Sequence, residues 1–244
     1  MRIEIIGLSS LPEVHPGDDL GRLIREAALA AGQPIDTSLL VAVAQKVVSK
    51  AEGAVVDLRE IQPSALARSW AAAWDKDARL IELILTQSRR IVRMDWGVLI
   101  AETRHGFVCA NAGVDQSNAG GEHLATVLPA DPDASARRLR ADIGCGAVIV
   151  TDTFGRPWRE GLVDVALGAA GFAPLDDWRG KADREGRRLA STIVAVADQI
   201  AAAAGLAMRK SDGCPAALVR GCEWHVADGS ARELIRPAGQ DLFR

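Results

Sequence analysis

The sequence predicts an α/β or α+β fold, with mixed sheets packed against helices, because apolar runs of strand length alternate with amphipathic stretches of helix length. Two apolar runs, 38–48 and 147–150, are bounded by turn-forming residues, which is typical of buried strands. At 244 residues, 48% of them hydrophobic, the chain can bury a sizeable core. We therefore expect a single domain over residues 1–244, or two tightly joined lobes.

The first half of the chain begins with a predicted strand, MRIEIIGLSS, and continues into a helix. Asp18 or Asp19 can cap this helix near Leu20, and Pro34 ends it. A second buried strand is expected over Ser38–Val48. The elements expected next are a strand over 55–61, helices over 64–74 and 77–89, and strands over 91–94, 98–102 and 107–110.

The second half alternates in the same way. A charged amphipathic helix over Asp133–Ile143, with its arginine side toward solvent, leads into the central strand at Ala147–Val150. A strand rich in small residues is expected over Val163–Gly171. The longest predicted helix spans Asp183–Met208, because apolar residues recur there at helical spacing, and a last buried strand covers Pro215–Val219.

Composition and charge argue against several classes of function. The formal net charge of −3 and the absence of tyrosine disfavour a nucleic-acid-binding protein. No apolar run approaches the length of a membrane span, and we expect the N-terminus to be a strand rather than a signal peptide. The cysteines, Cys109, Cys145, Cys214 and Cys222, form no C-x-x-C pair, so we expect buried free thiols and a reducing, cytoplasmic setting.

The stretch VIVTDTFGRPWREG, residues 148–161, carries the strongest candidate site. Its apolar run ends at Asp152 and Thr153, and we expect a turn at the following Gly-Arg-Pro. Carboxylate and hydroxyl oxygens suit a hard cation such as Mg²⁺ or Mn²⁺, while Arg156 and Arg159 suit phosphate or carboxylate groups. The alternative is a capping Asp before a polar loop with both arginines solvated, and spacing alone favours neither interpretation.

Two further segments carry candidate residues. Asp115, in the polar, glycine-rich loop 111–121, is the second candidate metal carboxylate, although a plain loop explains the same composition. Lys50 follows the predicted strand over 38–48, where an ammonium group before a glycine turn could hold phosphate. Taken alone, Lys50 is more typical of a surface lysine. The chain contains no Walker loop and no G-x-G-x-x-G motif.

Four motifs in order along the chain resemble one family: LPEVHPGDDL, VVSKAEG, HGFVCANAGVDQSN and TDTFGRPWREG. Later segments, PLDDWRGKADREGRRL, AVADQIAAAAGLAM and ALVRG, fit the same family. The chain resembles the coenzyme F420:L-glutamate ligases, the γ-glutamyl ligases that complete a deazaflavin coenzyme, from Ile3 to Gly221. Each motif is weak alone, but the ordered set is specific.

The resemblance implies a GTP-dependent ligase that joins the amine of L-glutamate to the terminal carboxylate of the coenzyme F420 precursor and releases GDP and phosphate. An acyl phosphate intermediate is expected, because a carboxylate oxygen is too poor a leaving group for attack by an amine. The resemblance also implies Mn²⁺ or Mg²⁺, with K⁺ as a further candidate ion. It implies a mixed α/β fold and an intertwined homodimer.

The site residues of the family carry over onto this sequence position by position. Its nucleotide contacts fall at Leu11, Pro12, Glu13, Val14, Gln45, Lys46, Lys50 and Asn118, and its metal positions fall at Asp115, Asp152 and Thr153. We assign Arg156 and Arg159 to phosphate or substrate carboxylate, as catalytic residues together with Asp152.

The chain departs from the family pattern after the predicted long helix, where relatives often carry Gly followed by Gln or Glu. Here the residues are Met208, Arg209 and Lys210, so we expect Lys210 to contact phosphate, and either one or two metals can bind. Gln45 and Lys46 stand where some relatives have hydroxyls, which leaves GTP and ATP open. A reductase-like domain fused to some relatives is expected to be absent. The alternative functions are an amide ligase with another acceptor and a non-catalytic nucleotide- or coenzyme-binding relative.

Overall fold

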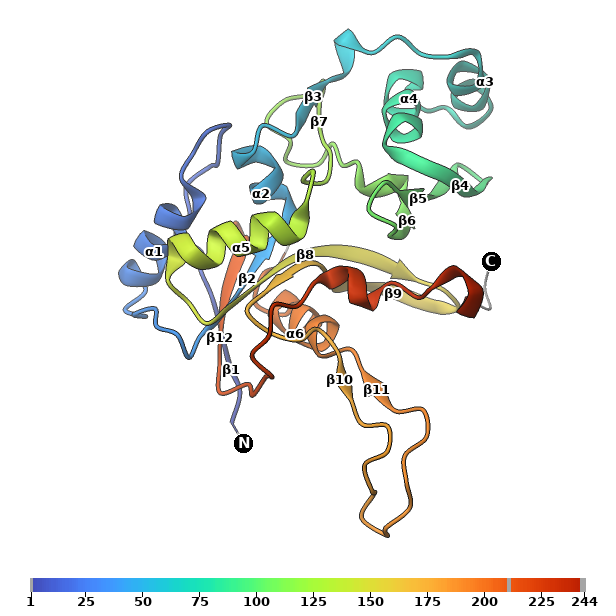
Figure 1. Cartoon of the computed structure of the whole chain (residues 1–244). Coiled ribbons are helices and arrows are strands. Elements are labelled where there is room, and N and C mark those ends of the chain that lie inside the picture. Colours follow the sequence, from blue (N-terminus) through green and yellow to red (C-terminus); the bar gives the residue numbers. More distant parts are fainter. Residues whose placement is uncertain (1, 210–211, 242–244) are drawn as a thin grey trace.

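A mixed five-stranded sheet forms the centre of the protein, as the computed structural model in Figure 1 shows. The structure describes residues 2–209 and 212–241. From one edge to the other, the strands are β1 (Glu4–Gly7), β12 (Ala216–Arg220), β2 (Leu40–Ala44), β8 (Ala147–Arg156) and β9 (Arg159–Ala170). β2 and β8 pair in parallel, and the other neighbouring pairs are antiparallel. The predicted fold class is confirmed.

Helices cover both faces of this sheet, because successive side chains of a strand point to opposite faces. Val41 of β2 faces one core and Leu40 faces the other. The first core is covered by α1 (Leu20–Ala30), α2 (Gln45–Ala51) and α5 (Pro132–Ile143), and the second by α6 (Val196–Gly205). In Figure 1, α5 and α6 accordingly lie on opposite sides of the sheet. β2 is buried on both faces, which explains its continuous apolar sequence.

Residues 55–127 form a second unit, the outer lobe, which has its own hydrophobic core. Its elements are β3 (Val55–Asp57), α3 (Ala65–Trp74), α4 (Ala78–Gln87), β4 (Ser88–Asp95), β5 (Val98–Thr103), β6 (Val108–Ala110) and β7 (Leu124–Thr126). β3 pairs with β7, and β4, β5 and β6 form a separate sheet (Figure 1). Ser64 and Asp77 accept hydrogen bonds from the first turns of α3 and α4, so both helices begin where the sequence predicts.

Smaller features complete the fold. Short 3₁₀ helices span Leu58–Glu60, Asn111–Gly113, Ala231–Leu234 and Ala238–Gln240. Cys109, Cys145, Cys214 and Cys222 are all free thiols, as predicted. The first three are buried, as predicted, whereas Cys222 is partly exposed. Among the described residues, no helix is both long and apolar enough to cross a bilayer.

The strand predicted over 38–48 is wrong in its second half. β2 ends one residue before Gln45, where α2 begins. The apolar run across this boundary fits both a strand and a helix, so its length alone could not separate the two. The helix brings Ser49 Oγ within 2.9 Å of Gln45 Oε1, one turn away. By the same geometry, Lys46 and Lys50 lie on one side of α2.

The long helix predicted over 183–208 is also wrong, because only its last part is helical. Residues 176–194 form an extended segment, the 176–194 arm, which projects from the body in Figure 1. Its two short strands are β10 (Asp176–Asp177) and β11 (Ile193–Val194), which pair with each other. Gly180 and Gly186 have φ values of +81° and +83°, a conformation that favours glycine and interrupts a helix.

The central strand is longer than predicted. β8 continues through Arg156, and its hairpin partner β9 pairs with it up to the Arg156–Arg159 pair. The predicted turn at Gly-Arg-Pro is therefore wrong, since the chain reverses at Pro157 and Trp158, and Trp158 has a φ of +57°. Asp152 consequently lies inside a strand rather than in a bend.

Candidate active site

The first turn of α2 and the loop after β6 meet at an ion pair between Lys46 and Asp115. Lys46 Nζ donates to Asp115 Oδ2 at 2.8 Å, to Ser117 Oγ at 2.7 Å and to the Ser117 carbonyl oxygen at 2.6 Å. The Ser117 backbone N–H donates to Asp115 Oδ1 at 2.7 Å, a local bond typical of Asp in a turn. Burial alone raises the pKa of Asp115, but the bonds from Lys46 and Ser117 outweigh it and lower the pKa.

Asp152 brings a second carboxylate to this ion pair from β8. Burial raises the pKa of Asp152 to about 6, and the neighbouring charge of Asp115 adds to the rise, while the Thr153 N–H and Lys46 oppose it. That N–H lies 2.8 Å from Asp152 Oδ1. Above pH 6, Asp152 is therefore an ionised carboxylate in an unfavourable environment, which a bound cation would relieve. We call these three residues the Lys46–Asp115–Asp152 cluster.

A second ion pair lies one helical turn further along α2. The Lys50 side chain is only 7% exposed, and its Nζ contacts a carboxylate oxygen of Glu13, whose side chain is 64% exposed. Lys50 is therefore not the surface lysine that its immediate sequence suggests. Glu13 lies in the loop before α1, where the Val14 side chain is buried and Pro12 is exposed. This loop is thus anchored by Val14 and lies against α2 at Lys50.

The donor set of the cluster fits a hard divalent metal. Among the described residues, no group of three or more His, Cys, Asp or Glu surrounds one point, so the chain offers two carboxylates rather than a complete cage. Mg²⁺ is commonly bound by one or two carboxylates, waters and substrate phosphates. The amines of Lys46 and Lys50 suit phosphate oxygens. The arrangement is chemically suited to a metal–phosphate group.

Comparisons with known proteins agree with the geometry of the cluster. The family model for F420-0:gamma-glutamyl ligase matches residues 9–221. The chain belongs to this family. It is therefore an enzyme of the ligase class, and the resemblance inferred from the motifs is confirmed.

Individual relatives match the chain over its full length. The coenzyme F420:L-glutamate ligase of Methanothermobacter thermautotrophicus is 45% identical over 100% of both chains. The protein of that name from Methanopyrus kandleri is 46% identical over 100% of this chain and 98% of its own length. That from Methanocaldococcus jannaschii is 38% identical over 100% of this chain and 97% of its own length. The matches thus cover nearly the whole length of each of these relatives.

Several residues of this chain that were assigned to the nucleotide have other partners or lie apart from the cluster. Gln45 is buried, and its Oε1 accepts the Ser49 hydroxyl. Leu11 packs on the core under α1. Asn118 is exposed three residues after Asp115, with a φ of +52°. Lys210 lies outside the described residues.

The Thr153 hydroxyl points away from the cluster, since alternate residues of β8 face opposite sides of the sheet. Thr153 Oγ1 donates to Asp164 Oδ1 of β9 at 2.6 Å. The same carboxylate lies against α6, where a Cβ added at Gly205 would stand 2.4 Å from Asp164 Oδ2. In this chain, Asp152 and the Thr153 hydroxyl therefore do not converge on one point.

Arg156 and Arg159 lie at the tip of the β8–β9 hairpin, away from the cluster. Arg156 is four residues beyond Asp152 in an extended strand, a separation of about 13 Å. Arg156 Nη2 donates to the Glu160 carbonyl across the turn, its Nε has no hydrogen-bond partner among the described residues, and Arg159 is exposed. Within one chain, the arginines do not share a site with Asp152.

Two residues of the site region were not singled out from the sequence. Ser117 binds both members of the Lys46–Asp115 pair, and its Asp-x-Ser spacing is a turn signal that could have identified it. Asp164 binds Thr153 across the hairpin, a contact that depends on strand register and has no local signal.

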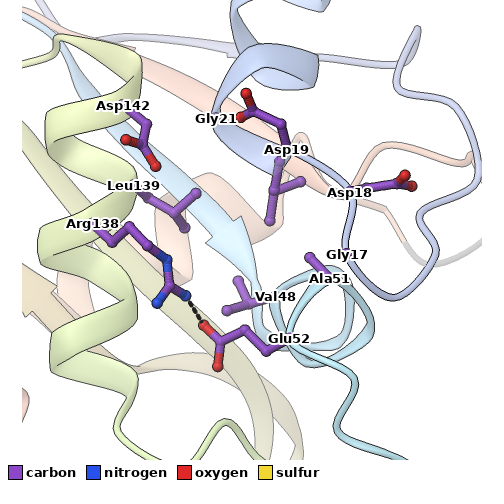
Figure 2. Close-up of a pocket in the computed structure, with 11 residues that line it drawn as sticks. Gly17, Asp18, Asp19, Gly21, Val48, Ala51, Glu52, Arg138, Leu139 and Asp142 are labelled. Carbon is purple, nitrogen blue, oxygen red and sulfur yellow. Dashed lines mark hydrogen bonds and ion pairs between the residues drawn. The ribbon is translucent and has the colours of Figure 1, made fainter.

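A cavity of about 510 Å³ between α1, α2 and α5 is separate from the cluster. Asp18, Asp19 and Asp142 line it, and Arg138 forms an ion pair with Glu52 inside it, as Figure 2 shows. None of the described residues predicted for the site lines this cavity. Its acidic lining disfavours phosphate groups.

Proposed function

We propose that this protein adds L-glutamate to the terminal carboxylate of the coenzyme F420 precursor, with GTP as phosphoryl donor and Mn²⁺ or Mg²⁺ as the metal. K⁺ is a further candidate ion. The Lys46–Asp115–Asp152 cluster carries the proposal, in a chain whose family and relatives are named for this ligation. Two carboxylates beside two ammonium groups are what a metal-bound triphosphate requires.

The reaction first activates the acceptor. A carboxylate oxygen of the coenzyme precursor attacks the γ-phosphorus of GTP, and the bond to the β-phosphate oxygen breaks, so that GDP leaves. The amine of L-glutamate then attacks the carbonyl carbon of the acyl phosphate, which forms the amide and releases phosphate and a proton. A metal at the cluster would neutralise the charge on the phosphate oxygens.

The side chains of the cluster have separate roles in this scheme. Asp115 and Asp152 would hold the metal, whose positive charge would favour the ionised form of both carboxylates. Lys46 neutralises Asp115 while the metal is absent, and its three donors can turn to phosphate oxygens when a metal takes over that carboxylate. Lys50 and the adjacent loop 11–14 bind the rest of the nucleotide, with Gln45 and Asn118 beside them. Family resemblance alone assigns Thr153 to the metal and Lys210 to phosphate, and in the metal-free chain the Thr153 hydroxyl is bonded to Asp164 instead.

We further propose an intertwined homodimer. The 176–194 arm projects from the body (Figure 1), and its Trp178 and Ile193 are 41% and 42% exposed. The β8–β9 hairpin exposes Trp158 and Leu162 at its end. Exposed apolar groups of this kind on projecting segments favour burial against a second chain. In such a dimer, Arg156 and Arg159 would serve the site of the partner chain, where they can bind phosphate or the substrate carboxylate.

The alternative functions use the same cluster differently. A non-catalytic nucleotide- or coenzyme-binding relative would not need two metal carboxylates, and both are present. An amide ligase with another acceptor would use the cluster unchanged.

Mass spectrometry of a complete reaction tests the proposal. Purified protein is incubated with unglutamylated coenzyme F420, L-glutamate, GTP and Mn²⁺, with ATP replacing GTP in a parallel reaction. We expect products heavier by one or more glutamyl units, and formation of GDP. The absence of product, with GTP binding intact, would indicate another acceptor. The absence of both product and nucleotide binding would contradict the proposal.

A further inference from the structure

A second cavity, of about 250 Å³, lies at the outer edge of β9. The C-terminal segment, coloured red in Figure 1, runs beside β9 and contributes Leu234 and Arg236 to its wall. Other parts of the wall come from the turn before β6, from the β8–β9 hairpin and from α6. Elements distant in the sequence therefore converge on this cavity. None of the residues assigned to the nucleotide or the metal is part of its wall.

Most of the cavity wall is aromatic or aliphatic. Phe107 and Phe154 face each other edge to face, with ring centroids 6.5 Å apart and an interplanar angle of 75°. Val165 and Leu234 extend this surface. Pockets that bind organic ligands combine such walls with a few polar groups that fix orientation. Phe107 is buried and Phe154 is half-buried, so this lining suits a flat ring that packs chiefly against Phe154.

Three charged residues, Asp198, Arg236 and Asp241, line the cavity, and the first two define the orientation that a ring would take. Asp198 Oδ1 accepts the Ala166 backbone N–H at 2.9 Å, and the recorded hydrogen bonds of the described residues leave Oδ2 without a donor. Arg236 is exposed at the cavity and supplies donors only. A carboxylate oxygen beside a guanidinium group complements a ring edge that carries an N–H next to a carbonyl. Burial also raises the pKa of Asp198, which a hydrogen bond to its free oxygen would oppose.

The cavity is adjacent to the Lys46–Asp115–Asp152 cluster. Val165 is the cross-strand partner of Asp152, so both side chains lie on the same face of the hairpin. Phe154 is two residues beyond Asp152 on that face, about 7 Å along the strand. A ligand anchored in the cavity would therefore extend directly toward the metal carboxylates.

We propose that this cavity binds the planar heteroaromatic ring of the acceptor, with Asp198 accepting an N–H from the ring edge. The inference rests on the proposed function, because the deazaflavin ring of the coenzyme is a ring of this chemical class. The cavity is smaller than the 300–1,000 Å³ typical of sites that enclose a whole drug-sized ligand, so it would hold the ring and leave the remainder of the acceptor outside. The largely apolar walls and the carboxylates of Asp198 and Asp241 disfavour the triphosphate as an occupant.

Two variants and a matched control test this site. Leu234→Trp fills the cavity, and Asp198→Asn keeps an oxygen for the Ala166 N–H while replacing the free carboxylate oxygen with an amide. Leu29→Trp makes the same size change on the exposed face of α1, where Leu29 is 76% exposed. Fluorescence titration measures the Kd of the free deazaflavin nucleoside, which lacks the terminal carboxylate, and steady-state assays measure KM for each substrate.

We expect Asp198→Asn to raise the Kd of the ring and the KM of the acceptor about tenfold, as the loss of one polar contact in a pocket commonly does. Leu234→Trp should raise both constants by at least about tenfold, because its indole occupies the space of the ring. The KM values for GTP and glutamate, and every constant of Leu29→Trp, should stay within about twofold of wild type. A ring methylated on its edge nitrogen should bind wild type and Asp198→Asn equally.

The outcomes separate this inference from the proposed function. If wild type forms no product but binds the ring, and both cavity variants weaken that binding, the site stands and the proposed ligation fails. If wild type forms product and the acceptor constants of both cavity variants match those of Leu29→Trp, the ligation stands and the ring site is wrong.

Discussion

Strand β8 contributes Asp152 to the Lys46–Asp115–Asp152 cluster and, further along, Arg156 to the tip of the β8–β9 hairpin. Lys46 and Asp115 of the cluster are paired with each other, whereas the tip is open to solvent. In the cluster, Lys46 donates a hydrogen bond to Asp115, which is 69 residues away in sequence, and Asp152 is half-buried, with its pKa raised by burial. At the tip, Arg159 is exposed and the neighbouring Trp158 is 79% exposed. A stretch that reads as one motif is thus divided into two places, because an extended strand separates residues that a turn would gather.

The largest expected effect tests the cluster side of this comparison, at Asp152. Asp152→Ala should lower kcat by about a thousandfold or more, because it removes one of two carboxylates that hold the metal, while the fold is retained. Activity assays and circular dichroism measure the two properties. Asp228→Ala, on an exposed segment, is the matched control and should be fully active. Retained activity in Asp152→Ala would contradict the metal assignment.

The hairpin tip is tested by complementation between chains. Arg159→Ala alone should lower activity about tenfold to a hundredfold if the arginine serves the site of a partner chain. An equal mixture of Arg159→Ala and Asp152→Ala, refolded together, should recover roughly a quarter of wild-type activity, because half of the dimers are mixed and each has one intact site. No recovery, or a monomeric mass by light scattering, would remove the arginines from the partner site.

The second ion pair sharpens the comparison inside the cluster region. Lys50→Ala should raise the KM for GTP about tenfold through loss of a buried ammonium group, with little change in the KM for glutamate. Glu13 is exposed, so loss of its partner should not unfold the protein. Lys76→Ala, an exposed lysine of the outer lobe, is the control. Unchanged affinity for GTP would exclude Lys50 from the site.

The smallest effect concerns folding and its pH dependence. The pKa of Asp152 is raised from 3.8 to about 6 by burial, so between these values the native state binds more protons than the unfolded state. The stability of the metal-free protein should therefore fall as pH rises from about 4 to about 6, by about 1–2 kcal/mol for a partly solvated group. Asp152→Asn should lack this loss. The denaturant midpoint of each protein is measured at pH 4 and at pH 8. The same change in midpoint between these pH values for wild type and Asp152→Asn would contradict the shift in the pKa of Asp152.

How far the fold could be predicted varied with how local its signals are. α3 and α4 were predicted well because Ser64 and Asp77 cap them through neighbouring residues. The boundary between β2 and α2 was missed because an apolar run fits both periods. The part of the arm from Asp183 onward was missed because apolar spacing was given more weight than Gly186.

The candidate site was predictable as a set of residues but not as an arrangement. Asp115, Asp152, Lys46 and Lys50 follow from motifs that the family shares. Their pairing does not, because Lys46 meets Asp115 and Lys50 meets Glu13 only through the folded chain. The separation of Thr153 from Asp152 follows from the alternation of a strand, which the predicted turn concealed.

Binding of Mn²⁺ tests the central claim most directly. Electron paramagnetic resonance would follow Mn²⁺ titrated into wild type, Asp152→Asn and Thr153→Val with a non-hydrolysable GTP analogue present. We predict that wild type and Thr153→Val bind Mn²⁺ within about threefold of each other, whereas Asp152→Asn binds it at least about tenfold more weakly. Equal binding by wild type and Asp152→Asn, or a loss confined to Thr153→Val, would contradict the Lys46–Asp115–Asp152 cluster as the metal site.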